Sequence, residues 1–327
     1  MFDSRLDARD KMLIDTFQRD FPLTSKPFAL VGETIGDSAE GAAARVARLI
    51  DAGVLSRLGP VLRPNSAGAS TLAAIAAPPH RLEEMAALVN DEPGVNHNYE
   101  REHAFNLWFV VTGPSRVAID ASLARIERRC GAPVLDLPML RAFHIDLGFP
   151  VFARNGRRKA RADAAAPLPP DAQDLILLTA LEDGLPLSQR PYAEIARRLG
   201  WREDQVIARL GDLVEKSVIA RFGLVVKHHA LGFRANAMVV WDIAAEALTD
   251  AAQILSDAAC VTLCYERPRR APVWRYNLFS MIHGCDRDVV RGEVAALAER
   301  IGDASAGHEI LFSRRCFRQR GARLSAA

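Results

Sequence analysis

The chain has 327 residues, of which 49% are hydrophobic and 25% are charged, and its net charge is +2 at pH 7. This composition suits two to four small globular domains and carries no overall signal for a polyanionic partner. Five cysteines without a C-x-x-C pair argue against a disulfide framework or a zinc site. A charged N-terminus and the lack of any run of about 18 apolar residues argue against a signal peptide and a membrane span. We therefore expect a cytoplasmic protein with reduced thiols.

The chain carries the same sequence pattern twice. Six residues recur at an offset of 164: Pro22, Pro27, Val54, Arg57, Gly59 and Gly68 return as Pro186, Pro191, Val218, Arg221, Gly223 and Gly232. The tripeptide Tyr99-Glu100-Arg101 returns as Tyr265-Glu266-Arg267, and the second copy then has an insertion before Tyr276. Two homologous halves in one chain predict an intrachain pseudo-dimer whose two sides are able to diverge.

Each half begins with helical patterns. In the first half, helices are expected over 11–19, 28–35 and 39–52, and the last of these ends at Gly53, a good residue to follow a helix. A short extended segment, 54–57, follows. This is the outline of a winged helix-turn-helix domain. The second half repeats it over 174–181, 192–199, 203–215 and 218–222.

A different pattern follows each helical part. The order strand, helix, strand, strand, helix, strand predicts a ferredoxin-like βαββαβ domain. Its expected elements are 71–77, 80–90, 94–101, 105–112, 115–130 and 133–146 in the first half, and 235–243, 247–257, 261–267, 275–283, 286–301 and 308–318 in the second.

The fold class is therefore α+β, as a tandem repeat of a helix-turn-helix and a βαββαβ domain. The basic and proline-rich segment 153–173 is typical of a flexible connector. The predicted domains are 1–67 and 68–152 in the first half, the linker 153–173, and 174–231 and 232–327 in the second half.

The segment 96–103 is unusually polar for a central strand. Because alternate side chains of a strand share a face, His97, Tyr99 and Arg101 are expected to point together, away from Asn96 and Asn98. On a face that no helix covers, this row suits anion binding and proton transfer. The alternative is a polar interface between the two pseudo-equivalent sheets.

The second copy replaces the histidine and adds arginines. His97 aligns with Leu263, and the insertion contributes Arg269, Arg270 and Arg275. Guanidinium groups bind carboxylates bidentately, so this cluster suits a ligand with several carboxylates, although a solvated surface or a phosphate contact is the alternative.

The histidines divide into two groups. His144 aligns with Arg318 in the repeat and, like His97, is a candidate general acid or iron ligand. The histidines at element ends are expected to be surface or capping residues: His80, His228, His229 and His283.

These residues carry a family resemblance. The layout, and residues 45–55, resemble the Lrp/AsnC regulators. More specifically, residues 96–101, 105–109 and 143–149 resemble the D-type subunit of sirohaem decarboxylase. Residues 264–270, 274, 276–279 and 317–321 resemble the L-type subunit, so the chain is similar to a fused D-L protein.

The resemblance implies a reaction, the loss of CO2 from the C12 and C18 acetate groups of sirohaem, giving 12,18-didecarboxysirohaem in haem d1 biosynthesis. It implies His97 and His144 as proton donors with Tyr99 as helper, and either histidine as an alternative ligand of the sirohaem iron. The implied substrate-binding residues are Arg101, Trp108, Tyr265, Arg267, Arg269, Arg270, Trp274 and Arg318. No cofactor beyond the tetrapyrrole is implied, because its macrocycle is an electron sink. The implied partners are sirohaem and further D-, L-, G- or H-type subunits or a second copy.

Two other functions remain open from sequence. An Lrp/AsnC-type transcription regulator needs base-reading and phosphate-binding side chains on its recognition helix. Residues 39–52 offer only Arg45 and Arg48 against Glu40 and Asp51, which argues against DNA as a partner. A haem sensor without catalysis shares the same site residues and differs only in lacking turnover.

Overall fold

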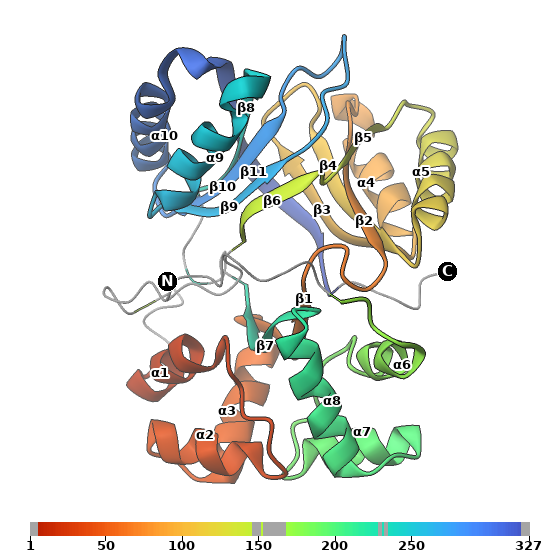
Figure 1. Ribbon diagram of the computed structural model, residues 1–327, viewed down its shortest axis with the longest axis vertical. Coiled ribbons are helices and arrows are strands. Elements are labelled where there is room, and N and C mark those ends of the chain that lie inside the picture. The colour runs from red at the N-terminus through yellow and green to blue at the C-terminus, as the bar shows by residue number, and fades with distance from the viewer. Residues whose placement is uncertain (1–5, 146–151, 153–167, 228–230, 232–234, 322–327) are drawn as a thin grey trace. The chain divides into compact units, whose positions relative to one another are not determined.

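The structure is a computed structural model that describes residues 6–145, 152, 168–227, 231 and 235–321 (Figure 1). The chain forms two compact units: residues 1–67 with 148–232, and residues 68–147 with 233–327. Each unit thus contains the corresponding domain from both sequence halves. Of the predicted linker, 153–167 lie outside the described residues. Its predicted end at 173 is wrong, because helix α6 begins at Ala172 with Asp171 as its cap.

The first unit contains the two helix-turn-helix domains. Their elements are α1 (Ala8–Phe17), α2 (Pro27–Ile35), α3 (Ala39–Asp51) and β1 (Leu55–Leu62), then α6 (Ala172–Ala180), α7 (Pro191–Leu199), α8 (Glu203–Glu215) and β7 (Ile219–Val226). Local chemistry explains the boundaries. Pro27 and Pro191 occupy the first turns of α2 and α7, where a missing N–H costs nothing. Gly36 and Gly200 end these helices in the left-handed conformation, at φ of 69° and 70°.

The two helix-turn-helix domains interlock. Strands β1 and β7 pair antiparallel, with Gly59 opposite Gly223. The hydroxyl of Tyr192 donates a hydrogen bond to the carbonyl of Pro22 at 2.8 Å. A Cβ on Gly223 would collide with the carbonyl oxygens of Phe17 and Gln18. Close approach of the backbones therefore accounts for a glycine at this repeated position.

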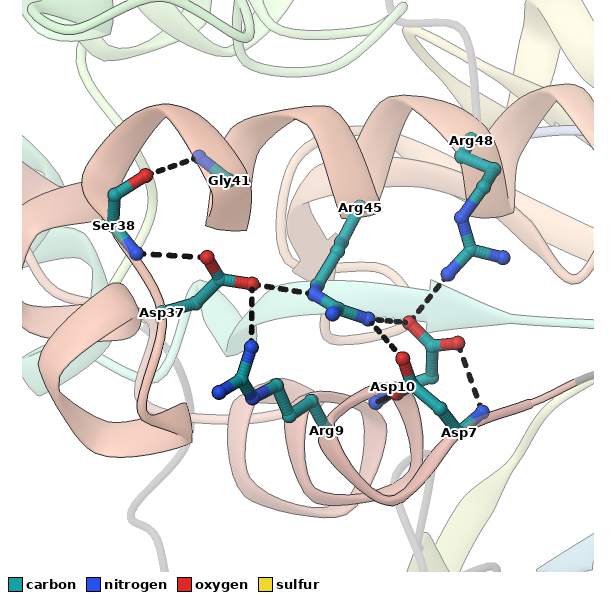
Figure 2. A network of polar contacts seen from close by, with 8 residues as sticks. All are labelled: Asp7, Arg9, Asp10, Asp37, Ser38, Gly41, Arg45 and Arg48. Carbon is teal, nitrogen blue, oxygen red and sulfur yellow. Dashed lines mark hydrogen bonds and ion pairs between the residues drawn. The ribbon is translucent and has the colours of Figure 1, made fainter.

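Helix α3 is tied to helix α1 by a polar network (Figure 2). Arg45 donates to Asp37 at 2.7 Å, to Asp7 at 2.6 Å and to Asp10 at 3.0 Å, and Arg48 donates to Asp10 at 2.6 Å. Asp10 is only 1% exposed. Both arginines of the helix that would read DNA are thus engaged by carboxylates of their own domain. The second half repeats the arrangement, since Arg209 pairs with Asp171 and Asp174.

The second unit contains the two βαββαβ domains. Its elements are β2 (Ala69–Ile75), α4 (Leu82–Asn90), β3 (Val95–Arg101), β4 (Leu107–Gly113), α5 (Arg116–Cys130), β5 (Leu135–Pro138) and β6 (Arg141–Ile145), then β8 (Ala235–Ile243), α9 (Leu248–Asp257), β9 (Val261–Glu266), β10 (Leu278–Gly284), α10 (Arg287–Ile301) and β11 (Ser305–Gln319). The predicted elements of this unit are present with small shifts at their ends, except for the segment 133–146, which forms two strands. In the described residues, no helix has both the length and the apolar run needed to cross a membrane.

The final strand of each half crosses to the other half. The sheet order is β5-β2-β4-β3-β11-β8-β10-β9-β6. Strand β11 pairs with β8 of its own half up to Phe312, and from Ser313 it pairs with β3 of the first half. In return, β5 pairs with β2 of its own half, whereas β6 pairs with β9 of the second. The prediction of one extended segment over 133–146 was therefore wrong, because this segment supplies strands to both halves.

Each sequence half contributes one part of this sheet, which we call a half-sheet. The two faces of a half-sheet pack against different hydrophobic cores. Helices α4 and α5 cover one face of the first half-sheet, and α9 and α10 cover one face of the second. The remaining faces share a core to which both halves contribute. Its buried members are Ala74, Trp108, Leu135, Leu137, Met238, Val240, Trp274, Tyr276, Phe279 and Leu311. We call this the central core, and the polar rows described next lie on the same faces.

Candidate active site

The row on β3 lies as the alternation predicts. The rings of His97 and Tyr99 are stacked with centroids 6.0 Å apart, and His97 Nδ1 lies 3.4 Å from the Tyr99 hydroxyl. The guanidinium of Arg101 lies over the Tyr99 ring at 5.6 Å. Asn98 points the opposite way and donates to the carbonyl of Ala86 in α4 at 3.1 Å. The helices thus cover the asparagine side and leave the His97 row on the face of the central core.

The second half completes this row. Strand β11 places Cys316 opposite Tyr99, Arg318 opposite Asn98 and Gln319 opposite His97. Arg318 is half-buried and donates to the carbonyl of Val95 at 3.4 Å. We call His97, Tyr99, Arg101 and Cys316 the first cluster; Arg318 lies on the adjacent strand β11, opposite Asn98. Because residues of both halves form it, neither half contains the cluster by itself.

Burial shifts the pKa of two residues of the first cluster, Tyr99 and Arg101. It raises the pKa of Tyr99, and the neighbouring Cys316 thiol adds to this effect, so the phenol keeps its proton at neutral pH. Burial also lowers the pKa of Arg101, which is 8% exposed and donates to the carbonyl of Leu311 at 3.1 Å. Arginine stays charged over any ordinary pH range, so Arg101 places a positive charge beside a neutral phenol.

A second cluster occupies the pseudo-equivalent position at the end of β9. The guanidinium of Arg267 lies over the Tyr265 ring at 4.8 Å and donates to the carbonyl of Leu137. Strand β6 places Ala142 opposite Tyr265 and His144 opposite Cys264. We call Tyr265 and Arg267 the second cluster; His144 lies on the adjacent strand β6, opposite Cys264. The two predicted histidines therefore lie on different strands, His97 on β3 and His144 on β6.

The arginines of the insertion are held by carboxylates and carbonyls. Arg269 and Arg275 both bind Asp242, and Arg270 donates to the carbonyl of Asp136 at 2.9 Å. Burial raises the pKa of Asp242, but its hydrogen bonds to the two guanidinium groups outweigh this and hold it below its usual range. The insertion therefore carries less uncompensated positive charge than its sequence predicts.

The two predicted tryptophans lie in the central core. Trp108 and Trp274 are each 1% exposed, and their ring centroids are 5.3 Å apart. The indole of Trp108 donates to the carbonyl of Phe105 at 2.6 Å. Both indoles are therefore enclosed by core side chains, and Trp274 also contacts Tyr276 and Phe279.

The prediction that His283 is a surface or capping residue was wrong. His283 lies on β10, and its Nδ1 is 2.8 Å from Oδ1 of Asn236 on β8. Burial and then the charge of Arg101 lower its pKa to about 4. The alternation Phe279, Met281, His283 would have placed it on the face of the central core. His228 and His229 lie outside the described residues, and His80 belongs to a short 3-10 helix at 79–81.

The repeated helix-turn-helix and βαββαβ architecture defines the class of protein. Residues 67–144 and 230–318 match the family model of the AsnC-like ligand binding domain. Residues 10–55 and 174–219 match the siroheme decarboxylase NirDL-like HTH domain. The chain is thus an Lrp/AsnC-like protein with two copies of each domain.

Similarity over the full length identifies the family more specifically. The chain is 46% identical over 327 residues to the siroheme decarboxylase NirDL subunit of Paracoccus denitrificans, covering 98% of both proteins. It is 52% identical over 146 residues to the siroheme decarboxylase NirD subunit of Stutzerimonas stutzeri, covering 45% of this chain and 96% of that subunit. The crystal structure of siroheme decarboxylase NirDL in complex with an iron-uroporphyrin III analogue matches with a TM-score of 0.69 at 25% identity, covering 97% of this chain and 93% of that one. The chain belongs to the NirDL family of siroheme decarboxylases.

Proposed function

We infer that this chain is a sirohaem decarboxylase, which removes CO2 from the C12 and C18 acetate groups to give 12,18-didecarboxysirohaem in haem d1 biosynthesis. The observation that carries this inference is the first cluster, in which strand exchange adds Cys316 to the row His97, Tyr99 and Arg101. It combines a titratable donor, a protonated phenol and a guanidinium group in a chain that matches the NirDL subunit over 98% of its length.

The chemistry requires one proton for each CO2 that leaves. When the bond from the methylene carbon to the carboxylate breaks, its electron pair passes into the pyrrole and the macrocycle, which acts as the electron sink. A proton then converts the methylene carbon to a methyl group. We assign His97 as one proton donor and His144 as the other. Tyr99 keeps its proton and orients His97, 3.4 Å away.

The substrate carboxylates need cations. We propose Arg318 as one of them, because it is half-buried on β11, the strand that pairs with β3. Arg101 and Arg267 contribute positive charge from buried positions, where each is anchored to a backbone carbonyl. Arg269 and Arg270 act at longer range, since each already has a partner. Trp108 and Trp274 are buried in the central core, and Tyr265 packs against this core.

The helix-turn-helix domains are better explained as structural than as DNA readers. A recognition helix binds DNA through side chains that extend into the groove. Here Arg45 and Arg48 instead bind carboxylates of their own domain (Figure 2). We propose that these domains hold the two halves together and that the enzyme works in the cytoplasm, alone or with further subunits of the same family, with no cofactor beyond its substrate.

The test is anaerobic incubation of the purified chain with sirohaem, followed by absorption spectra and mass spectrometry of the tetrapyrrole. We expect two successive losses of CO2. A shifted spectrum with unchanged mass would instead indicate a haem sensor. An unchanged spectrum, together with binding to duplex DNA at moderate salt, would favour a transcription regulator.

A further inference from the structure

A third histidine lies on the same inner faces as the two clusters. On β10, Phe279 and Met281 pack in the central core, and His283 follows them on the same face. The intervening Ile282 packs on the opposite side, among the residues beneath α9 and α10. His283 therefore ends a row that faces the first half.

The strand register brings His283 to the first cluster. Arg101 donates to the carbonyl of Leu311, and Leu311 lies opposite Met238 on β8. Asn236, two residues before Met238, lies opposite His283. The second half thus contributes Cys316 through β11, and it places Asn236 and His283 on the next two strands, β8 and β10, where the charge of Arg101 acts on His283.

Asn236 determines the tautomer of His283. The amide oxygen of Asn236 only accepts hydrogen bonds, so Nδ1 of His283, 2.8 Å away, carries the proton. In a neutral imidazole the lone pair then lies on Nε2. Metal-binding histidines are typically held in this way, by donation from the second ring nitrogen to an oxygen.

The other cluster has no equivalent pair among the described residues. The repeat aligns His283 with Thr112 and Asn236 with Ser70, which lie opposite each other on β4 and β2. Neither hydroxyl residue is a usual ligand of haem iron, whereas histidine is. The difference makes the two clusters chemically distinct.

We propose that His283 binds the iron of the tetrapyrrole through Nε2 in the first cluster, with Asn236 as its positioning residue. This proposal rests on the proposed function for the identity of the ligand. In this proposal His97 remains the proton donor. The iron ligand, His283, then comes from the second half of the chain, and the proton donor comes from the first half.

The test uses the full-length chain loaded with iron uroporphyrin III, which reports ligation without turnover. Electronic absorption and electron paramagnetic resonance spectra of the ferric complex are compared for the unaltered chain, His283→Ala and His97→Ala. We expect a histidine-ligated spectrum that His97→Ala retains and His283→Ala loses, with recovery on addition of imidazole. Asn236→Ala should weaken binding of the tetrapyrrole about 10- to 100-fold. His80→Ala, on the short 3-10 helix, is the matched control.

Each other outcome overturns the proposal. It fails if the unaltered chain shows no histidine ligation, or if His283→Ala keeps the signature while His97→Ala or His144→Ala loses it. If His283→Ala does not fold, His283→Gln replaces it, because glutamine keeps a donor toward Asn236. Retention of the histidine-ligated spectrum in His283→Gln would also overturn the proposal. Turnover of sirohaem is measured separately. Ligation that depends on His283 in a chain without turnover would contradict the proposed function and leave the assignment of the iron ligand standing.

Discussion

Replacing Asp242 by Asn tests whether the arginine-rich insertion is held by an internal ion pair. The carboxylate is 11% exposed and binds Arg269 and Arg275, whose side chains are 38% and 58% exposed. A hydrogen bond to a charged group contributes about 1.5 to 3 kcal/mol when buried, and exposure of both arginines reduces this through solvent screening. We therefore expect a loss of roughly 2 kcal/mol for the pair of contacts in Asp242→Asn.

This loss is large enough to measure. For a unit of this size, 1 kcal/mol corresponds to about 2 to 4 °C in Tm, so Asp242→Asn should lower the Tm of the second unit by roughly 4 to 8 °C. Thermal unfolding followed by circular dichroism is the assay. Asp303→Asn, at an exposed carboxylate after α10, is the control and should leave the Tm unchanged.

The effect also has a defined pH dependence. The folded-state pKa of Asp242 is lowered, so its stabilisation is complete above the unfolded value of about 3.9 and is lost as the pH falls through the folded value. The difference between Asp242→Asn and the unaltered chain should be constant from pH 7 to about 5 and narrow in more acidic buffer. Equal stability at pH 7, or a difference that persists in strong acid, would refute the role given to these ion pairs.

Three further predictions follow from the clusters and the backbone contacts. His97→Ala and His144→Ala should each lower decarboxylation about 10²- to 10⁴-fold if each is a proton donor, and full turnover in either would remove that residue from the mechanism. Arg318→Gln should weaken sirohaem binding by about 10- to 100-fold with folding unchanged, because it removes a charged hydrogen-bond donor; spectrophotometric titration measures this, and unchanged affinity would contradict its role. Gly223→Ala should destabilise the first unit by about 1 to 3 kcal/mol through its clash with backbone carbonyls, whereas Gly211→Ala, with open space at its Cβ, should stabilise helix α8 by about 0.5 to 1 kcal/mol; urea unfolding compares them, and similar effects in both would show that the clash is relieved.

Local sequence determined the elements of this protein and their repetition. Asp7 and Asp171 form capping boxes at the starts of α1 and α6 because each carboxylate reaches the backbone N–H three residues on. Strand alternation by itself predicts that His97, Tyr99 and Arg101 share one face. These features depend on neighbours within a few residues, so the chain alone is enough to predict them; the capping box and the Tyr-Glu-Arg tripeptide occur in both halves.

Only the tertiary structure decided which strands meet and which charges are compensated. The alternation of a strand encodes which of its faces is buried, but it does not encode which edge the strand pairs with. For that reason the sequence did not reveal that β6 and the end of β11 cross between the halves, or that His97 and His144 lie on strands that are far apart in the sheet. The same reason applies to Asp242, which lies 27 residues from Arg269 and 33 from Arg275 and meets them only when β8 and the insertion fold together. His283 likewise acquired its place beside Arg101 from pairings between strands that are distant in sequence.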